Sequence, residues 1–453
     1  MAVALAATTP LARAADTGGA DDIEAPDSSA LETAPAVSVR AGGDVRLRQE
    51  SFDNIPIRTA DPAVTRGGRN DYFRVRTRVG AGIDAGDAVS FDVRATDEFR
   101  VRNIGGKSYE FPDEILLDQL KISLRGLFDG AADLTLGRQD LLLGSGRLFA
   151  EGTAKDGSRT QFFDGAHLRL RPGDRKTLDV FAFYGSCETD LALGHEHRDL
   201  TGLGGGYNGM DEGSAGFFYE DRSSEALGWG LYYVWLLDTS WTQPDGTRMG
   251  REDVHTVGAR LMPRFSAGWS AELEGAVQAS GNSGYDRRAF FGFASLRRDG
   301  MSGTGPERGI YASANALYLS GDDPETQRRE DFNILYGRYP WISELMLYSF
   351  DGDGVGTWRN LAMTWLETGA AWGERKENAV RLAAGPVWAG ESDGAGGGSY
   401  RGFLESLYWS FPVASGSLGA LDGHLFLELY QPGSYYASSK NAFFFRWQLN
   451  WTF

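Results

Sequence analysis

From residue 37 onward, apolar and polar residues alternate along the chain with a period of two. In 443–453 every second residue is Phe, Trp or Leu, and the residues between them are mostly polar. In 89–96 Val, Phe and Ala alternate in the same way with Ser, Asp, Arg and Thr. A period of two places one set of side chains on each face of an extended strand. The pattern therefore predicts an all-β protein.

The alternating segments are long. Many contain about 10 to 15 residues, whereas strands of soluble proteins usually contain about 5 to 6 and a tilted membrane-crossing strand needs about 9–11. We expect about 18 strands, at residues 37–52, 70–86, 88–101, 114–128, 132–144, 160–172, 176–187, 214–223, 227–238, 252–265, 268–281, 286–300, 307–321, 357–373, 378–391, 399–412, 421–432 and 443–453. Segment 357–373 alternates poorly and 343–350 is another candidate strand, so 16 and 20 strands remain alternatives.

The connections between these segments differ in length according to parity. Those after odd-numbered segments are mostly long, for example 53–69, 188–213 and 322–356, and those after even-numbered segments are mostly short, for example Asp87. Barrels of bacterial outer membranes have short periplasmic turns and long extracellular loops. The sequence thus predicts a transmembrane antiparallel up-and-down β-barrel in the outer membrane of a Gram-negative-type bacterium, with both ends of the barrel chain in the periplasm.

The first 36 residues differ from the rest. Residues 1–14 contain an apolar stretch that ends in Ala12-Arg13-Ala14, which is typical of a signal-peptide cleavage site. A disordered N-terminal tail is the alternative for this stretch. Residues 15–36 are acidic and small, as in a disordered periplasmic lead-in. We therefore divide the chain into a signal-peptide remnant (1–14), a lead-in (15–36) and the barrel (37–453).

Composition removes two other classes of protein. The chain of 453 residues has one cysteine, Cys187, so an intrachain disulfide cannot stabilise it. A net charge of −17 disfavours nucleic acid as a partner. No motif indicates a cofactor, and Asp322-Asp323, Asp351–Gly354 and His195–His197 are interpreted as loop or surface residues because too few metal ligands accompany them.

Two ordered strings of residues carry a family resemblance. The first runs from Leu136-Gly137-Arg138-Gln139 through Gly146-Arg147-Leu148 to Phe163-Asp164-Gly165, and the second is 333–345 (NILYGRYPWISEL). Together with the early Arg-rich strand and the terminal aromatic residue, they resemble the alginate-export family of outer-membrane porins. The resemblance implies transport of an alginate-like acidic polysaccharide, or of another anionic or sugar-like solute, through a positively lined pore.

The aromatic C-terminus resembles the signal that the barrel-assembly machinery of the outer membrane reads. Phe453 is the last residue and follows alternating aromatic residues, although the glycine that usually lies several residues upstream is absent. Membrane lipids and this machinery are therefore expected partners.

The arginines of several strands occupy the polar phase of the alternation. A charge on the lipid-facing side near the middle of the bilayer costs about 2–4 kcal/mol, so these side chains should point into the lumen. The expected pore-lining residues are Arg46, Arg48, Arg74, Arg76, Arg78, Arg94, Lys121, Arg125, Arg169, Arg381 and Arg446. Arg138, Arg147 and Arg159 are assigned to the pore constriction by the family resemblance alone.

The lumen charges allow two interpretations. A planar guanidinium binds carboxylates and stays charged, which favours an anion-selective path. Inward acidic residues, however, are also expected, and they would pair with the arginines into a neutral lattice that only braces the wall. These candidates are Asp92, Glu98, Asp118, Glu272, Glu274, Glu367 and Glu428. Loops 145–159, 188–213 and 322–356 are long enough to fold inward and narrow the pore.

Three functions are compatible with such a barrel. A channel is the leading interpretation. A structural or adhesive barrel without transport is the second. An outer-membrane hydrolase is the third, for which His167 and His255 lie in strands, but no nucleophile motif accompanies them.

Overall fold

The computed structural model describes residues 36–56, 69–104, 115–151, 162–185, 192–193, 212–238, 241–242, 248–249, 251–280, 286–300, 309–337, 342–349, 359–373 and 377–453. The predicted signal remnant 1–14 lies outside these residues, as does all but the last residue of the lead-in 15–36. Within the described part of the chain, no helix has the length and apolar character that a membrane crossing requires.

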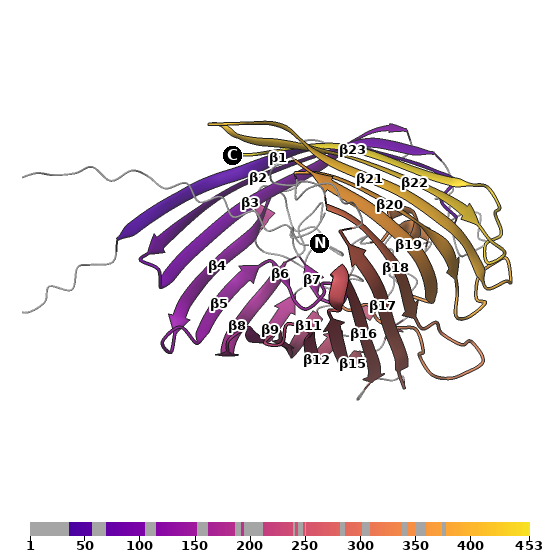
Figure 1. The fold of residues 1–453 in the computed structure, drawn as a ribbon, viewed down its shortest axis with the longest axis horizontal. Helices are drawn as coiled ribbons and strands as arrows, with labels where there is room; N and C mark the ends of the chain where they lie inside the picture. Colours follow the sequence, from indigo (N-terminus) through magenta and orange to yellow (C-terminus); the bar gives the residue numbers. More distant parts are fainter. Residues whose placement is uncertain are drawn as a thin grey trace, which may run out of the picture. The chain divides into compact units, whose positions relative to one another are not determined.

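The described chain forms a closed antiparallel β-barrel (Figure 1). Its sheet has nineteen strands: eighteen form the barrel wall, and the two-residue strand β10 (Ala192–Leu193) pairs with the end of β4. The barrel strands are β1 (Val37–Asp53), β2 (Asn70–Ala85), β3 (Val89–Ile104), β4 (Ile115–Leu127), β5 (Ala132–Gln139), β8 (Phe163–Gly173), β9 (Lys176–Gly185), β11 (Glu212–Asp221), β12 (Leu227–Asp238), β15 (Glu252–Pro263), β16 (Trp269–Ser280), β17 (Arg288–Asp299), β18 (Gly309–Leu319), β19 (Leu361–Trp372), β20 (Asn378–Trp388), β21 (Tyr400–Gly416), β22 (Gly419–Pro432) and β23 (Ala442–Thr452). Each strand pairs with its neighbours in the chain, and β1 pairs with β23 to close the sheet. Every backbone donor of such a wall finds an acceptor within it, and no sheet edge is left open.

Each predicted strand corresponds to one barrel strand, so the prediction of about 18 strands is confirmed. The end of one predicted strand and the additional candidate strand were wrong. Segment 132–144 is strand only as far as Gln139, because the chain then turns into the lumen. Segment 343–350, the additional candidate strand, instead contains a short helix, α1 (Glu344–Ser349).

The two faces of the wall differ in polarity. Val79, Ile83, Val257 and Leu366 point outward and are exposed, as are many other large apolar side chains. Their strand neighbours of opposite parity, such as Arg76 and Arg78, point inward. The outer surface is therefore the lipid-facing one, as the alternation predicted.

Part of the interior is filled by two loops that fold inward. The first is residues 140–151, which contain the short strands β6 (Leu141–Leu142) and β7 (Ala150–Glu151). The second comprises residues 320–337 and 342–346 of the connection between β18 and β19. Tyr336 N–H donates to the Leu148 carbonyl at 3.0 Å, so the two loops are joined to each other.

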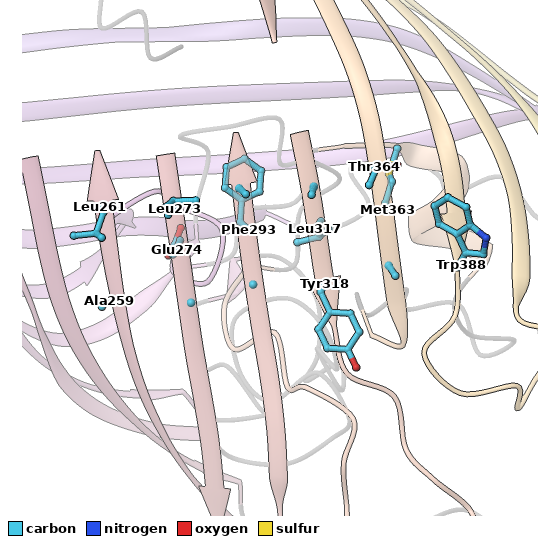
Figure 2. Close-up of a pocket in the computed structure, with 15 residues that line it drawn as sticks. Ala259, Leu261, Leu273, Glu274, Phe293, Leu317, Tyr318, Met363, Thr364 and Trp388 are labelled. Carbon is cyan, nitrogen blue, oxygen red and sulfur yellow. The ribbon is translucent and has the colours of Figure 1, made fainter. Parts of the chain in front are cut away.

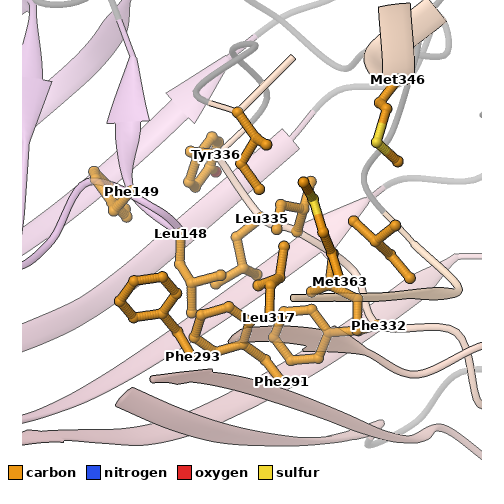
Figure 3. Packing of buried hydrophobic residues seen from close by; sticks show 14 of the residues in the cluster. Leu148, Phe149, Phe291, Phe293, Leu317, Phe332, Leu335, Tyr336, Met346 and Met363 are labelled. Carbon is orange, nitrogen blue, oxygen red and sulfur yellow. The ribbon is translucent and has the colours of Figure 1, made fainter. Parts of the chain in front are cut away.

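Aromatic and aliphatic side chains pack around these loops (Figure 3). The ring of Phe149 lies 4.6 Å from Phe181 and 5.0 Å from Tyr336, centroid to centroid. A Cβ on Gly337 would lie 1.6 Å from the Arg147 carbonyl oxygen, so only glycine permits this close approach of the loops. We call this set the apolar cluster, and it comprises Leu148, Phe149, Phe163, Phe181, Phe183, Phe218, Phe291, Phe293, Leu317, Phe332, Leu335, Tyr336, Met346 and Met363.

Candidate functional site

The interior of β1, β2, β3, β4 and β23 is lined by charged side chains. Arg46 lies opposite Arg76 and Arg48 lies opposite Arg74 across the β1–β2 pair. Like charges in such positions repel each other. The acidic residues of the same phase relieve this repulsion, and we call the whole set the charged wall, which comprises Asp44, Arg46, Arg48, Glu50, Arg74, Arg76, Arg78, Arg94, Glu98, Asp118 and Arg446.

Glu50 is the centre of the charged wall. Its carboxylate has no solvent exposure. It accepts a hydrogen bond from Arg48 at 3.3 Å and one from Arg74 at 3.1 Å, and Arg446 on β23 contacts it directly. Three guanidinium groups therefore share one carboxylate. Arg48 and Arg74 come from the first two strands of the barrel, and Arg446 comes from the last.

Two further carboxylates extend the ion pairs of the charged wall toward the periplasmic side. Glu98 accepts hydrogen bonds from Arg46 at 2.9 Å and from Arg74 at 2.9 Å. Asp44 binds Arg76 at 2.9 Å and Arg78 at 2.5 Å. Buried charges are tolerated where several partners satisfy each group, so these arginines are held in fixed positions.

The ion pairs of the charged wall continue to the start of the first inward loop. Arg94 binds Asp118 at 2.8 Å and Asp140 at 3.0 Å. Asp140 immediately follows β5 and is the first residue of the loop. The charged wall thus fixes the position at which the chain leaves the wall and enters the lumen.

The second inward loop is attached to the wall at α1. The backbone N–H groups of Glu344 and Leu345 donate to the Glu428 carboxylate at 3.2 and 2.9 Å. The Glu344 carboxylate contacts Arg446, which also binds Glu50. The loop is therefore anchored to the charged wall on one side and packed in the apolar cluster on the other.

Arg147 connects the first inward loop to the opposite side of the barrel. Its guanidinium binds Glu272 at 2.5 Å and Glu274 at 2.9 Å on β16. It also lies 3.4 Å from the centroid of the Phe293 ring. Arg147 is therefore inside the lumen, but both its charge and its flat face are already engaged by the wall.

Arg381 on β20 is held much more loosely. Its closest carboxylate, Glu367, is 4.0 Å away, and Tyr311 already donates to that carboxylate at 2.7 Å. The guanidinium lies 5.7 Å from the Tyr408 ring. A cavity of ≈ 40 Å³ beside it is lined by Ile342 of the second inward loop, among others. Arg381 is therefore held less tightly by its wall partner than the arginines of the charged wall are.

The other expected lumen cations take intermediate positions. Arg169 binds Asp179 at 2.7 Å, and His167 shares this carboxylate. Arg125 donates to Ser90 at 2.9 Å near the periplasmic end. Lys121 lies opposite Asp92 across the β3–β4 pair, on the inward face. All three side chains are half-buried or exposed within the lumen.

The structure corrects the position expected for Arg138. Gln139 lies opposite the inward-facing Phe163, so Arg138, one residue earlier, lies on the outer face opposite Asp164. It binds that carboxylate at 2.7 Å and covers the Phe162 ring. The resemblance placed it at the constriction, but the period of two excludes it from the lumen. Arg159 lies outside the described residues.

The two strand histidines lie on different faces. His167 faces the lumen beside Asp179, whereas His255 faces outward and contacts Tyr233 at 2.8 Å. They cannot serve one site. In the described residues no group of three or more acidic, His or Cys side chains is arranged to hold a metal ion. Residues 195–197 and 351–354 lie outside those residues.

One loop carboxylate at the extracellular mouth has a shifted pKa. Burial alone would raise the pKa of Asp331, but Arg287, Arg329 and Arg359 hold it below its ordinary value of 3.8. Arg287 and Arg359 each lie 3.5 Å from the carboxylate. The first part of the second inward loop is therefore fixed by charge at neutral pH.

Sequence reasoning missed several members of the site. Asp44 and Glu50 have the same phase as Arg46 and Arg48, so the alternation contained the signal that they face inward. The alternation did not predict that Arg287 and Arg401 face inward, because they lie at the ends of strands. Each is nearly fully buried, and Arg401 donates to the Asn360 carbonyl at 3.0 Å.

Comparison with known proteins identifies the same architecture. The outer membrane protein opdK from Pseudomonas aeruginosa aligns with a TM-score of 0.54 and 13% identity over 91% of this chain and 99% of its own. Pseudomonas aeruginosa OccK3 (OpdO) gives 0.53 and 14% over 91% and 95%. OccD3 (OpdP) from the same organism gives 0.53 and 10% over 91% of each chain. No protein-family model and no curated protein sequence matches this chain.

The fold and the distribution of side chains determine where the protein resides. A closed barrel with an apolar outer surface and a charged interior is stable only with lipid outside and water within. Barrels of this kind are found in bacterial outer membranes. The chain is accordingly an integral outer-membrane protein.

Proposed function

We propose that the protein is a porin that passes small, charged, water-soluble solutes across the outer membrane. The observation that carries this proposal is the lumen itself. Its charged wall runs from Glu50 toward the periplasmic side as far as Asp44 and Arg78, and two inward loops occupy the lumen beside it. A narrowed, charged lumen favours small ions over polymers because only a solute that replaces lost hydration with wall contacts passes readily.

Arg381 is the residue that we expect to contact carboxylate-bearing solutes. Arginines of the charged wall lie 3.3 Å or less from wall carboxylates. The carboxylate nearest to Arg381, in contrast, is 4.0 Å away. A solute carboxylate accordingly displaces little when it binds Arg381, and a bidentate pair forms with favourable geometry.

The experiment is planar-bilayer recording of purified, refolded protein. We expect discrete single-channel steps and a reversal potential that indicates weak anion preference in a salt gradient. Arg381→Ala should shift this potential toward cations. Arg138→Ala is the matched control, because Arg138 lies on the outer face and its removal should leave the potential unchanged.

An alginate-like acidic polysaccharide is a narrower proposal for the cargo. Its support is the resemblance of the two sequence strings, and the abundance of lumen arginine is compatible with it. Added oligouronates should then interrupt the current more often than neutral oligosaccharides of equal length. Equal interruption by both would remove the polysaccharide proposal and leave the small-solute porin.

A structural barrel without transport is the second candidate. The apolar cluster favours it, because the cluster fills part of the lumen with side chains that water does not enter. Electrical silence at all salts and voltages, in a preparation that shows the heat-sensitive gel mobility of a folded barrel, would support this candidate over the porin.

We also propose that Phe453 is read by the barrel-assembly machinery. Its side chain is exposed on the outer face, while its backbone pairs with Gly43 at 3.0 Å. Deleting this residue should reduce the amount of folded barrel in the membrane without altering the conductance of the molecules that do fold.

A further inference from the structure

The outer face of the barrel carries a groove across β15 to β22. It consists of three adjoining hollows of ≈ 540, ≈ 690 and ≈ 1070 Å³. The first two share Leu273 and Ala294, and the last two share Leu296 and Ala384, so the hollows form one continuous groove. Figure 2 shows the first of these hollows, which is lined by Leu261 of β15, Leu273 of β16, Tyr318 of β18 and Trp388 of β20.

The groove arises from the size of the outward side chains. The successive outward residues 312, 314 and 316 of β18 are all alanine, and Gly292 and Ala294 lie beside them on β17. Leucines stand at its sides, among them Leu296 and Leu366, which is 71% exposed. A row of small residues between leucines leaves a shallow apolar groove on the outer face.

A cation lies at the periplasmic end of this groove. Arg298 is the last outward residue of β17 and lines the largest hollow. Its guanidinium lies 5.9 Å from the Trp269 ring and donates to the Asp299 carbonyl at 3.2 Å. Among the residues that the structure describes, no carboxylate side chain forms an ion pair with Arg298. Trp and Arg at this level are typical of the membrane–water boundary.

We propose that the groove binds one glycerophospholipid of the periplasmic leaflet, with its phosphate on Arg298 and an acyl chain along the alanine floor. The positive charge at the rim complements a phosphate, and the apolar groove complements the chain. Glu405 lies at the other side of the same hollow, on β21, and its negative charge excludes the phosphate from that side. The lipid is therefore oriented with its head group toward the periplasm.

The test is native mass spectrometry of the full chain released from detergent micelles, with synthetic phosphatidylglycerol as the probe. The wild type should retain one phosphatidylglycerol molecule. Arg298→Ala should reduce the retained fraction about fivefold, since one surface cation near anionic lipid contributes about that factor. Ala314→Trp should abolish retention by filling the groove without changing any charge.

The controls distinguish a specific lipid site from the nonspecific association of lipid with the outer face of the barrel. Arg288→Ala removes an outward arginine at the opposite end of the same strand and should leave retention unchanged. Diacylglycerol has the same chains but no phosphate. The wild type should retain it no better than Arg298→Ala retains phosphatidylglycerol. Equal retention of both lipids, or of phosphatidylglycerol by Arg298→Ala and wild type, would overturn the proposal. A dimer of the chain that Ala314→Trp abolishes, without lipid retention, would overturn it in favour of a contact between two copies.

Discussion

The two sides of the lumen are ordered by different interactions. The charged wall consists of long cationic side chains held by a few buried carboxylates, so the loss of one carboxylate affects several arginines at once. The apolar cluster consists of many ring and methylene contacts, each of them weak. Charge networks fail abruptly when a member is removed, whereas packed clusters lose stability in proportion to the volume removed. The charged wall therefore fixes its own side chains and the points at which the loops attach, and the apolar cluster packs the loops against each other.

The largest effect is expected from removal of the carboxylate at the centre of the charged wall. Glu50→Ala leaves Arg48, Arg74 and Arg446 without a shared carboxylate, and breaking a buried pair costs about 3–5 kcal/mol. We expect the barrel to unfold at a markedly lower temperature in gel-mobility assays. Asp84→Asn is the control, since the Arg40–Asp84 pair is largely exposed on the arginine side and such pairs contribute about 0–1 kcal/mol. Equal losses in both variants would contradict the difference between buried and exposed pairs.

The matching change in the apolar cluster is Phe149→Ala. Removal of a buried Phe side chain costs about 3–5 kcal/mol in a closed core, and the loop position of Phe149 places the expected loss at the lower end of that range. Because the rings of Phe163, Phe181 and Tyr336 lose their common neighbour, the first inward loop should loosen. Single-channel conductance should rise and loop proteolysis should accelerate. Phe290→Ala, on the outer face of β17, is the control and should change neither.

Two lumen arginines should respond differently to substitution, because one is held by two carboxylates and the other by a single weak contact. Arg74→Ala should lower thermal stability strongly, because Glu50 and Glu98 both lose a partner. Arg381→Ala should lower stability by about 1 kcal/mol or less, as for other weak pairs, but should change ion selectivity. The two measurements are melting by gel mobility and reversal potential. A stability loss at Arg381 as large as that at Arg74 would show that both are structural.

The smallest expected effect concerns pH at the extracellular mouth. The pKa of Asp331 is lowered in the folded protein, so its contribution to stability is present above the ordinary value of 3.8 and is lost as the pH falls through the lower, folded value. The second inward loop should thus resist protease at pH 7 and become more accessible well below pH 3.8. Asp331→Asn should be equally accessible at both pH values. Unchanged protection of the wild type in acid would show that the apolar cluster alone holds the loop.

The strands of the barrel wall and the faces of their side chains were predicted far better than the loops inside the lumen. A period of two specifies which face each side chain takes, so the inward positions of Arg46, Arg74 and Arg446 followed directly from it. The predicted acidic partners Glu98, Asp118, Glu272 and Glu274 bind arginines as the lattice interpretation requires. The inward course of the loops was expected only from their length.

Contacts made by irregular chain could not be predicted in the same way. The largely apolar segment 343–350 was a candidate strand. In the structure, Leu345 binds Glu428 and Glu344 binds Arg446, and these partners lie about 80 to 100 positions later in the sequence. No local period encodes such a contact. Arg138 shows the complementary error. The resemblance assigned it to the constriction, whereas the strand register in the structure places it on the same outer face as Leu134 and Leu136.

The pairing of β1 with β23 has a consequence for biogenesis. The first strand of the barrel finds its second neighbour only in the final eleven residues of the chain. Until those residues have been exported, β1 presents a long unpaired edge that invites aggregation. Closure must then join the first and last barrel strands in one late step, and pairing between segments so far apart in sequence is intrinsically slow.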